Sequence, residues 1–262
     1  MTTPRIYLPQ KMEEGSTVEL RYENLHYIKN VLRLKRGNPL ILFDGMGFEY
    51  ESTIRDITVK SATVEIIRKN PFQVDNSIKI TLAQALPKGN KMDFIIQKAS
   101  ELGVTRIIPF KSSRSIPKLA GNKIHLKMPR WQKIAVEASR KCGRENIPEI
   151  TDIITYEKAL QWPKEGILKI IFWEGETNTG IKEILHSKKY EGVTDFFIVV
   201  GPEGGFSNEE IEMASKVGFL PASLGRLVLK VETAVLVILS ILQYEKGAFG
   251  NQNIKTENLT TK

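Results

Sequence analysis

Asp195-Phe196-Phe197-Ile198-Val199-Val200-Gly201-Pro202-Glu203-Gly204-Gly205-Phe206-Ser207 is the stretch of the sequence that decides the fold. Five of its first six residues are apolar, which is typical of a strand covered on both faces by helices. A glycine-rich loop follows, and Ser207 with Glu210 three residues later has the pattern of a capping box that opens a helix. A strand, a glycine loop and a capped helix in this order predict a ligand-sized opening at the carboxyl edge of a sheet.

The glycine loop also has an ordinary interpretation, as a tight connection between strand and helix that holds no ligand. It is not a nucleoside-triphosphate loop, because no Gly-Lys-Ser/Thr follows it. Nor is it the dinucleotide fingerprint, because the glycine spacing differs and Pro202 lies inside the loop.

The composition indicates a soluble globular protein of one large or two ordinary domains. The chain has 262 residues, of which 41% are hydrophobic and 26% are charged. Its longest apolar run, Ala234–Leu242, is too short to span a bilayer, so we expect no membrane partner. The first residues lack the apolar core of a signal peptide, and the single Cys142 excludes an internal disulfide, which together favour a cytoplasmic location. Three scattered histidines predict no metal site.

Positive charge is concentrated in the middle of the chain. The formal net charge is +8, but residues 79–145 alone carry 15 Lys and Arg against 4 Asp and Glu. Such a cluster is the expected footprint of a polyanion such as RNA. The alternative is a lysine-rich face that serves only solubility.

Residues 1–75 predict a separate small β-barrel. Short segments rich in β-branched and aromatic residues alternate with turns, and Asn24–Leu34 has the pattern of a helix. The predicted strands are Arg5–Leu8, Thr17–Leu20, Pro39–Phe43, Phe48–Ile54 and Thr63–Ile67.

Residues 77–247 predict a parallel α/β domain, and the polar residues 248–262 form a C-terminal tail. Asn90 is placed to cap a helix that runs to Leu102, and Pro129 opens a helix whose apolar stripe includes Trp131 and Cys142. A final helix from Glu232 to about Glu245 is apolar nearly all round, so we expect it to be buried in the core or in a subunit interface. The expected strands are Ile78–Ala85, Thr105–Phe110 (stopped by Pro109), Leu168–Trp173, Asp195–Val200 and Phe219–Leu224.

Several motifs in this order resemble the SPOUT methyltransferases and, within them, the small-subunit ribosomal RNA methyltransferase E family. The resemblance is carried by Val200–Ser207, by Ser223-Leu224-Gly225 and by Leu229-Lys230-Val231-Glu232-Thr233-Ala234. Upstream segments agree with it, namely His26, Val31–Leu34, Lys91-Met92-Asp93, Ile96-Gln97-Lys98, Glu101–Val104, Arg114, Trp131–Ile134, Cys142-Gly143-Arg144 and Pro148-Glu149-Ile150.

The resemblance implies a fold, an activity and partners. The fold would be a PUA-like β-barrel followed by an α/β-knot methyltransferase domain with a deep trefoil knot. The activity would be transfer of a methyl group from S-adenosyl-L-methionine to N3 of a uridine in 16S rRNA, with the assembled small ribosomal subunit as substrate. The protein would be a homodimer through the knotted domain.

We expect three loops to hold the cofactor, with glycines that permit a close backbone approach. In chain order these loops are Phe172–Gly175, Val200–Gly205 and Ser223–Leu229. Trp173 could equally pack in the core, and Glu203 could either meet a ribose hydroxyl or only cap the next helix. The expected cofactor-binding residues are Phe172, Trp173, Glu174, Val200, Gly201, Pro202, Glu203, Gly204, Gly205, Ser223, Leu224, Gly225, Val228, Leu229 and Thr233.

Methylation at uridine N3 requires loss of a weakly acidic proton, which a base must take while a positive group stabilises the anion. We expect Arg144 to orient the base or phosphate and Glu232 to handle the proton. Each has an ordinary alternative at a helix end. The expected RNA-binding residues are Arg5, Arg33, Arg36, Lys91, Arg114 and Lys141.

The sequence departs from the family pattern at three positions. Leu227 and Lys230 stand where the family usually has arginines, and Lys141 stands where a glutamine is usual. Lysine does not reproduce the bidentate fork of arginine. Four other functions therefore remain as alternatives: methylation of tRNA, methylation of a ribose 2′-hydroxyl, RNA binding without catalysis, and nucleotide binding by an α/β protein whose basic region serves solubility.

Overall fold

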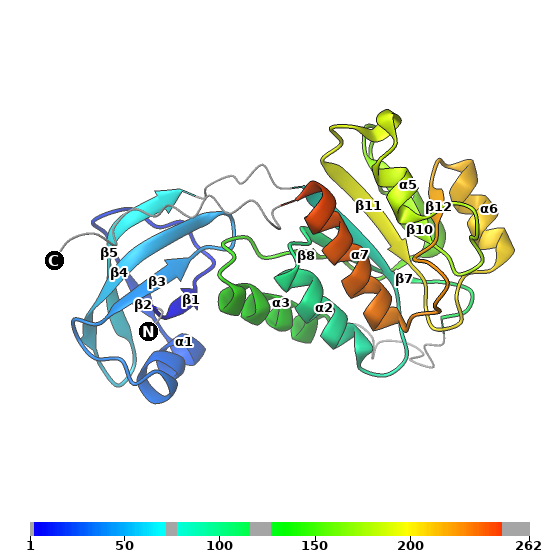
Figure 1. Ribbon diagram of the computed structural model, residues 1–262. Helices are drawn as coiled ribbons and strands as arrows, with labels where there is room; N and C mark the ends of the chain where they lie inside the picture. The colour runs from blue at the N-terminus through cyan, green and yellow to red at the C-terminus, as the bar shows by residue number, and fades with distance from the viewer. Residues whose placement is uncertain (1–2, 72–77, 116–126, 248–262) are drawn as a thin grey trace. The chain divides into compact units, whose positions relative to one another are not determined.

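The computed structural model describes residues 3–71, 78–115 and 127–247, which form two compact units (Figure 1). Unit 1 contains the described residues up to 71 together with 127–149, and unit 2 contains residues 78–115 and 150–247. The sequence-based division assigned everything from 77 to 247 to one domain. By its contacts, the segment 127–149 groups with unit 1, because its helix packs against the first strand.

Unit 1 is built on a five-stranded sheet with the order β1-β3-β4-β5-β2. β1 pairs with β3 in parallel, and the other neighbours are antiparallel. All five strands were expected, although β4 and β5 are longer than predicted. Their bounds are β1 Arg5–Tyr7, β2 Thr17–Leu20, β3 Pro39–Phe43, β4 Phe48–Ile57 and β5 Ala62–Pro71.

The predicted helix Asn24–Leu34 is only partly confirmed. The chain forms α1 (Tyr22–His26) and then a π-helical turn, η1 (Tyr27–Val31). The prediction is wrong beyond Val31, because Arg33 takes a left-handed backbone conformation with a φ of +53°. A non-glycine residue in that region interrupts a right-handed helix.

The helix α3 (Met128–Cys142) closes unit 1 against β1. Its predicted apolar stripe is confirmed at Trp131, Ala135 and Ala138, which are buried. Cys142 was expected to face inward, but it is exposed at the last position of the helix, just before Gly143 takes a left-handed conformation. The stripe therefore covers the helix only up to its last turn.

Unit 2 contains a parallel sheet with the strand order β12-β10-β11-β6-β7-β8, and β9 also pairs with β7. The predicted α/β class is thereby confirmed. The short strands β8 and β9 were not predicted. Pro109 does not stop β7, because the flanking backbone continues to pair and the Leu86 N–H donates to the Phe110 carbonyl. The bounds are β6 Lys79–Ala85, β7 Arg106–Lys111, β8 Glu149–Ile150, β9 Ile154–Thr155, β10 Leu168–Phe172, β11 Asp195–Val200 and β12 Leu220–Ala222.

Helices cover the sheet of unit 2. α4 and α6 contribute to an apolar cluster with Phe110, Phe197 and Phe206. α2 and α7 lie side by side, and α7 contacts β11 (Figure 1). The bounds are α2 Lys91–Glu101, α4 Tyr156–Leu160, α5 Ile181–Leu185, the 3₁₀ turn η4 Lys188–Tyr190, α6 Asn208–Lys216 and α7 Val231–Lys246.

The last helix is less buried in this chain than its apolar sequence predicts. Val235, Ile238 and Leu239 are buried, but Leu236 is half-buried and Tyr244 is 73% exposed. One side of α7 is thus only partly covered by the described residues of this chain. No helix among those residues is long and apolar enough to cross a membrane.

The strand-loop-helix prediction around Gly201 is confirmed. β11 ends at Val200, and α6 opens with the complete capping box. The Ser207 hydroxyl accepts from the Glu210 backbone N–H at 3.2 Å, and the Ser207 N–H donates to the Glu210 carboxylate at 2.9 Å. Asn90 precedes α2 as expected, but its side chain makes no capping hydrogen bond.

This difference between the two helix starts gives a stability prediction. Ser207→Ala should lower the free energy of unfolding by about 1 kcal/mol, because it removes the acceptor for the Glu210 N–H. The matched control is Asn90→Ala, which removes no capping bond and should change the stability by less than about 0.5 kcal/mol. Urea unfolding of both variants is the measurement, and equal losses would contradict the capping argument.

Candidate active site

Three loops of unit 2 surround one pocket at the carboxyl ends of β10, β11 and β12. Its volume is about 360 Å³, which lies within the range of small-molecule sites. Thirteen of the fifteen expected cofactor-binding residues line it, all except Gly204 and Thr233. Lys91 and six further residues that the cofactor prediction did not include also line it, namely Ala222, Arg226, Leu227, Lys230, Val231 and Ala234.

The glycine loop brings backbone close to the pocket wall. Gly205 has a φ of +65°, and a Cβ there would overlap the Glu174 carboxylate. A Cβ on Gly201 would come within 3.1 Å of the Phe206 ring. Any side chain at Gly205 would therefore strain the backbone and displace a residue that lines the pocket.

Backbone hydrogen bonds tie the first loop to the third. The Trp173 N–H donates to the Ala222 carbonyl at 3.1 Å, and the Ser223 N–H donates to the Thr179 carbonyl at 2.9 Å. Trp173 lines the pocket and also packs against the apolar cluster under α6.

Glu203 does not cap the following helix, since Ser207 and Glu210 do so. Its carboxylate accepts from the Lys91 ammonium at 2.7 Å and from the Lys88 N–H at 3.1 Å. Burial disfavours the charged form of Glu203, but the hydrogen bonds from Lys91 and from backbone N–H groups outweigh it and hold the pKa of this carboxyl below its ordinary value.

Glu232 lies in the first turn of α7 beside this pair. One of its carboxylate oxygens, Oε2, is covered from solvent and makes no hydrogen bond with any described residue. The same oxygen lies 3.6 Å from the Lys91 ammonium, which is beyond hydrogen-bond length. A covered oxygen with an unused lone pair can accept a proton.

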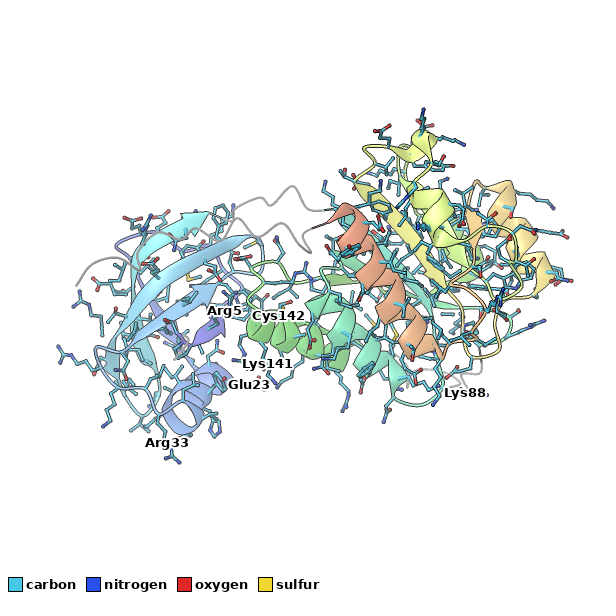
Figure 2. All side chains as sticks on the ribbon, in the orientation of Figure 1. Arg5, Glu23, Arg33, Lys88, Lys141 and Cys142 are labelled. Carbon is cyan, nitrogen blue, oxygen red and sulfur yellow. The ribbon has the colours of Figure 1, made fainter. Side chains whose placement is uncertain are left out.

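The two expected catalytic residues lie in different units. Arg144 belongs to unit 1, where it follows α3, and burial lowers the pKa of its guanidinium. Its backbone carbonyl accepts from the Arg5 guanidinium at 2.9 Å (Figure 2 labels Arg5 beside the end of α3). Arg5 also forms an ion pair with Glu49 and lies over the Phe43 ring at 4.9 Å.

The residues expected to bind RNA fall into two groups. Arg33, Arg36 and Lys141 are exposed in unit 1. The other three are already hydrogen-bonded within the protein. Arg5 donates to the Arg144 carbonyl, Lys91 donates to the Glu203 carboxylate, and Arg114 donates to the Gly204 carbonyl at 3.1 Å. A positive side chain in the sequence thus does not by itself show where its charge is used.

Comparison with known protein families identifies the domains of which this chain is built. A model described as an RNA methyltransferase domain matches residues 74–243, and one described as an RNA methyltransferase PUA domain matches residues 20–67. The chain is therefore built from the domains of an RNA methyltransferase.

Individual relatives are more specific. The chain is 31% identical to ribosomal RNA small subunit methyltransferase E of Bacillus subtilis, over 90% of this chain and 93% of the relative. It is 33% identical to the protein of the same name from Buchnera aphidicola subsp. Schizaphis graminum, over 93% of this chain and 97% of the relative. The chain belongs to the ribosomal RNA small subunit methyltransferase E family, and the resemblance seen in the sequence is confirmed.

Solved structures agree with this assignment. A methyltransferase from Legionella pneumophila, in complex with the cofactor SAM, is 36% identical with a TM-score of 0.82, over 93% of this chain and 98% of that one. A small subunit methyltransferase E from Neisseria gonorrhoeae, bound to S-adenosyl methionine, is 33% identical with a TM-score of 0.81 and the same coverage.

The contacts of Arg5 give a prediction within unit 1. Arg5→Met should lower the free energy of unfolding by about 2 kcal/mol, because it leaves the half-buried Glu49 carboxylate without its cation. Arg36→Met is the control, since Arg36 is exposed, and it should cost less than about 0.5 kcal/mol. Urea unfolding measures both, and a stable Arg5→Met protein would show that the ion pair does not support the barrel.

Proposed function

We propose that this protein transfers a methyl group from S-adenosyl-L-methionine to N3 of a specific uridine in 16S rRNA. The observation that carries the proposal is the pocket built by three loops, in a chain 36% and 33% identical to two proteins solved with that cofactor bound. The name shared by the relatives supports ribosomal RNA of the small subunit as the substrate. An enzyme that acts on ribosomal subunits meets them in the cytoplasm, which is the location we propose.

The proposed topology is the SPOUT knot, in which the chain after β12 passes through the loop that follows β10. Two features support it. The hydrogen bonds of Ser223 hold the start of the third loop against Thr179 and Ile181, and α7 then returns from the edge strand β12 to pack beside α2 and β11. We also propose a homodimer through this domain, supported by the partly covered side of α7 around Leu236.

The pocket fits the proposed cofactor in size and in its walls. A volume of about 360 Å³ accommodates a nucleoside with an amino-acid chain, and the backbone around Gly201 and Gly205 leaves no side chain in the way. We propose that the backbone of Gly201, Leu224 and Leu229 binds the adenine and ribose. The bound cofactor would supply an electrophilic methyl group, and the protein contributes chiefly by holding the acceptor in line with it.

Two residues are proposed to act on the uridine. Glu232 takes the N3 proton, because one of its carboxylate oxygens is covered from solvent, makes no hydrogen bond with a described residue and follows Val231, which lines the pocket. Arg144 orients the base or its phosphate and stabilises the developing negative charge. Its main-chain carbonyl is held by the Arg5 guanidinium, which supports a defined start for that side chain.

The exposed basic residues are proposed to bind the RNA backbone. In unit 1 the exposed residues of this set are Arg33, Arg36 and Lys141, and in unit 2 it is Arg114. Each contact with a phosphate releases counterions, so we expect binding to small subunits to weaken steeply as salt concentration rises. A uridine that is paired or stacked in the rRNA must first be exposed before it can reach the pocket.

Transfer of labelled methyl groups to small ribosomal subunits that lack native modification tests the function. One new 3-methyluridine, found by nucleoside analysis, is the expected result. Ribose methylation, or transfer to tRNA instead, would overturn the proposed site. Subunit binding without transfer would indicate an RNA-binding protein in which Leu227 and Lys230 mark lost catalysis.

Glu232→Gln tests the proposed base. The amide keeps the shape of the side chain but cannot take a proton at neutral pH, so kcat should fall about 100-fold or more. The Kd for S-adenosylmethionine should rise no more than the few-fold expected from a weaker contact with Lys91. Glu245→Gln is the matched control, because Glu245 lies on the same helix with 30% side-chain exposure against 25% for Glu232. A kcat for Glu232→Gln within twofold of the wild-type value would assign the proton to another acceptor.

A further inference from the structure

Lys91 connects three segments that are far apart in the sequence. It lies in the first turn of α2 and lines the pocket. Its ammonium donates to Glu203 of the glycine loop at 2.7 Å and lies 3.6 Å from Glu232 of α7. Glu203 lines the cofactor pocket, and Glu232 follows Val231, which also lines it.

A second contact strengthens the connection between α2 and the glycine loop. The backbone N–H of Lys88, which is labelled in Figure 2, donates to both oxygens of the Glu203 carboxylate at 3.1 and 3.2 Å. Glu203 is thus held by the side chain of Lys91, at the start of α2, and by the main chain of Lys88, just before that helix. The hydrogen bond to Glu203 raises the pKa of Lys91, so the ammonium stays charged at neutral pH.

The electrostatic effect of Lys91 follows from this placement. Without its ammonium, Glu203 and Glu232 would face each other as two carboxylates with no cation between them, and like charges at close range repel. Glu203 would lose a charge-assisted hydrogen bond that holds it in the loop. Both the glycine loop and the start of α7 line the pocket, so a shift of either changes its shape.

We propose that Lys91 is a positioning residue whose ammonium holds Glu203 and Glu232 in place and thereby fixes two walls of the cofactor pocket. This role differs from the phosphate contact expected from the sequence, and it rests on the proposed function of the pocket. Lys91 acts through the two carboxylates and is not itself assigned a step in the chemistry.

The chain offers a closely matched control on the same helix. Lys98 donates to Glu101 at 2.7 Å, the same distance as from Lys91 to Glu203, and the two lysine side chains are 31% and 35% exposed. The Lys98 pair joins residues three apart within α2, whereas the Lys91 pair joins α2 to a distant loop. Comparing the two separates the loss of an ion pair from the loss of a connection between loops.

Calorimetric binding of S-adenosylmethionine to the full chain is the first measurement. Lys91→Met should raise the Kd about three- to tenfold, as expected for a partly exposed charged hydrogen bond, and Lys98→Met should raise it less than about twofold. Lys91→Arg should recover part of the affinity. In combination with Glu203→Gln, Lys91→Met should cost less than the sum of the two single effects, because both remove the same contact.

Amide hydrogen exchange of the protein without cofactor gives an independent readout. The Lys88 and Gly205 amides should exchange faster in Lys91→Met and at the wild-type rate in Lys98→Met, because the glycine loop has lost its anchor. Unchanged exchange and unchanged Kd in Lys91→Met would overturn the inference. If the wild-type protein bound no S-adenosylmethionine, the proposed function would fail, while the exchange data would still decide whether Lys91 holds the loop.

Discussion

The site depends on three parallel strands that end at the same level. In the register of the sheet, Phe172 of β10 pairs with Val200 of β11 on one side and with Ala222 of β12 on the other. The next residues of all three strands therefore leave the sheet along one line, and their loops open together. The strand ends are apolar and buried on both faces, so a shift of one residue in register would move each side chain to the opposite face, where the packing is built for another side chain, and would also separate the loops.

This constraint explains why the pocket could be predicted so well from the sequence. Parallel strands end on one edge, and the glycine loop after Val200 identifies that edge without any knowledge of the other strands. The capping box at Ser207 fixes where the loop stops. Lys91 was not recognised as a partner of Glu203, because 112 residues separate them and only the folded chain brings them together. Its positive charge led to the prediction that it binds RNA, but the charge of a side chain does not by itself determine which group it contacts.

The division between the units shows a different limit of sequence reasoning. The periodicity of α3 correctly indicated that Trp131 is buried, but a stripe does not say which surface will cover it. Residues 127–149 follow elements of unit 2 in the chain and yet pack in unit 1, where Arg5 and Gly45 meet the segment after the helix. Their contacts group them with unit 1, whereas the RNA methyltransferase domain model matches them together with the rest of residues 74–243.

Two of the three departures from the family pattern, Leu227 and Lys230, line the pocket. Leu227 is 78% exposed and Lys230 is also exposed, so neither residue supports the core. A leucine donates no hydrogen bond, and a lysine offers a point charge in place of the planar fork of arginine. Arg226 is the one arginine in the loop 223–230, and it follows Gly225, whose φ of +107° turns the chain there. Arg226, which lines the pocket, is therefore the one side chain of this loop that has the planar fork for bidentate hydrogen bonding.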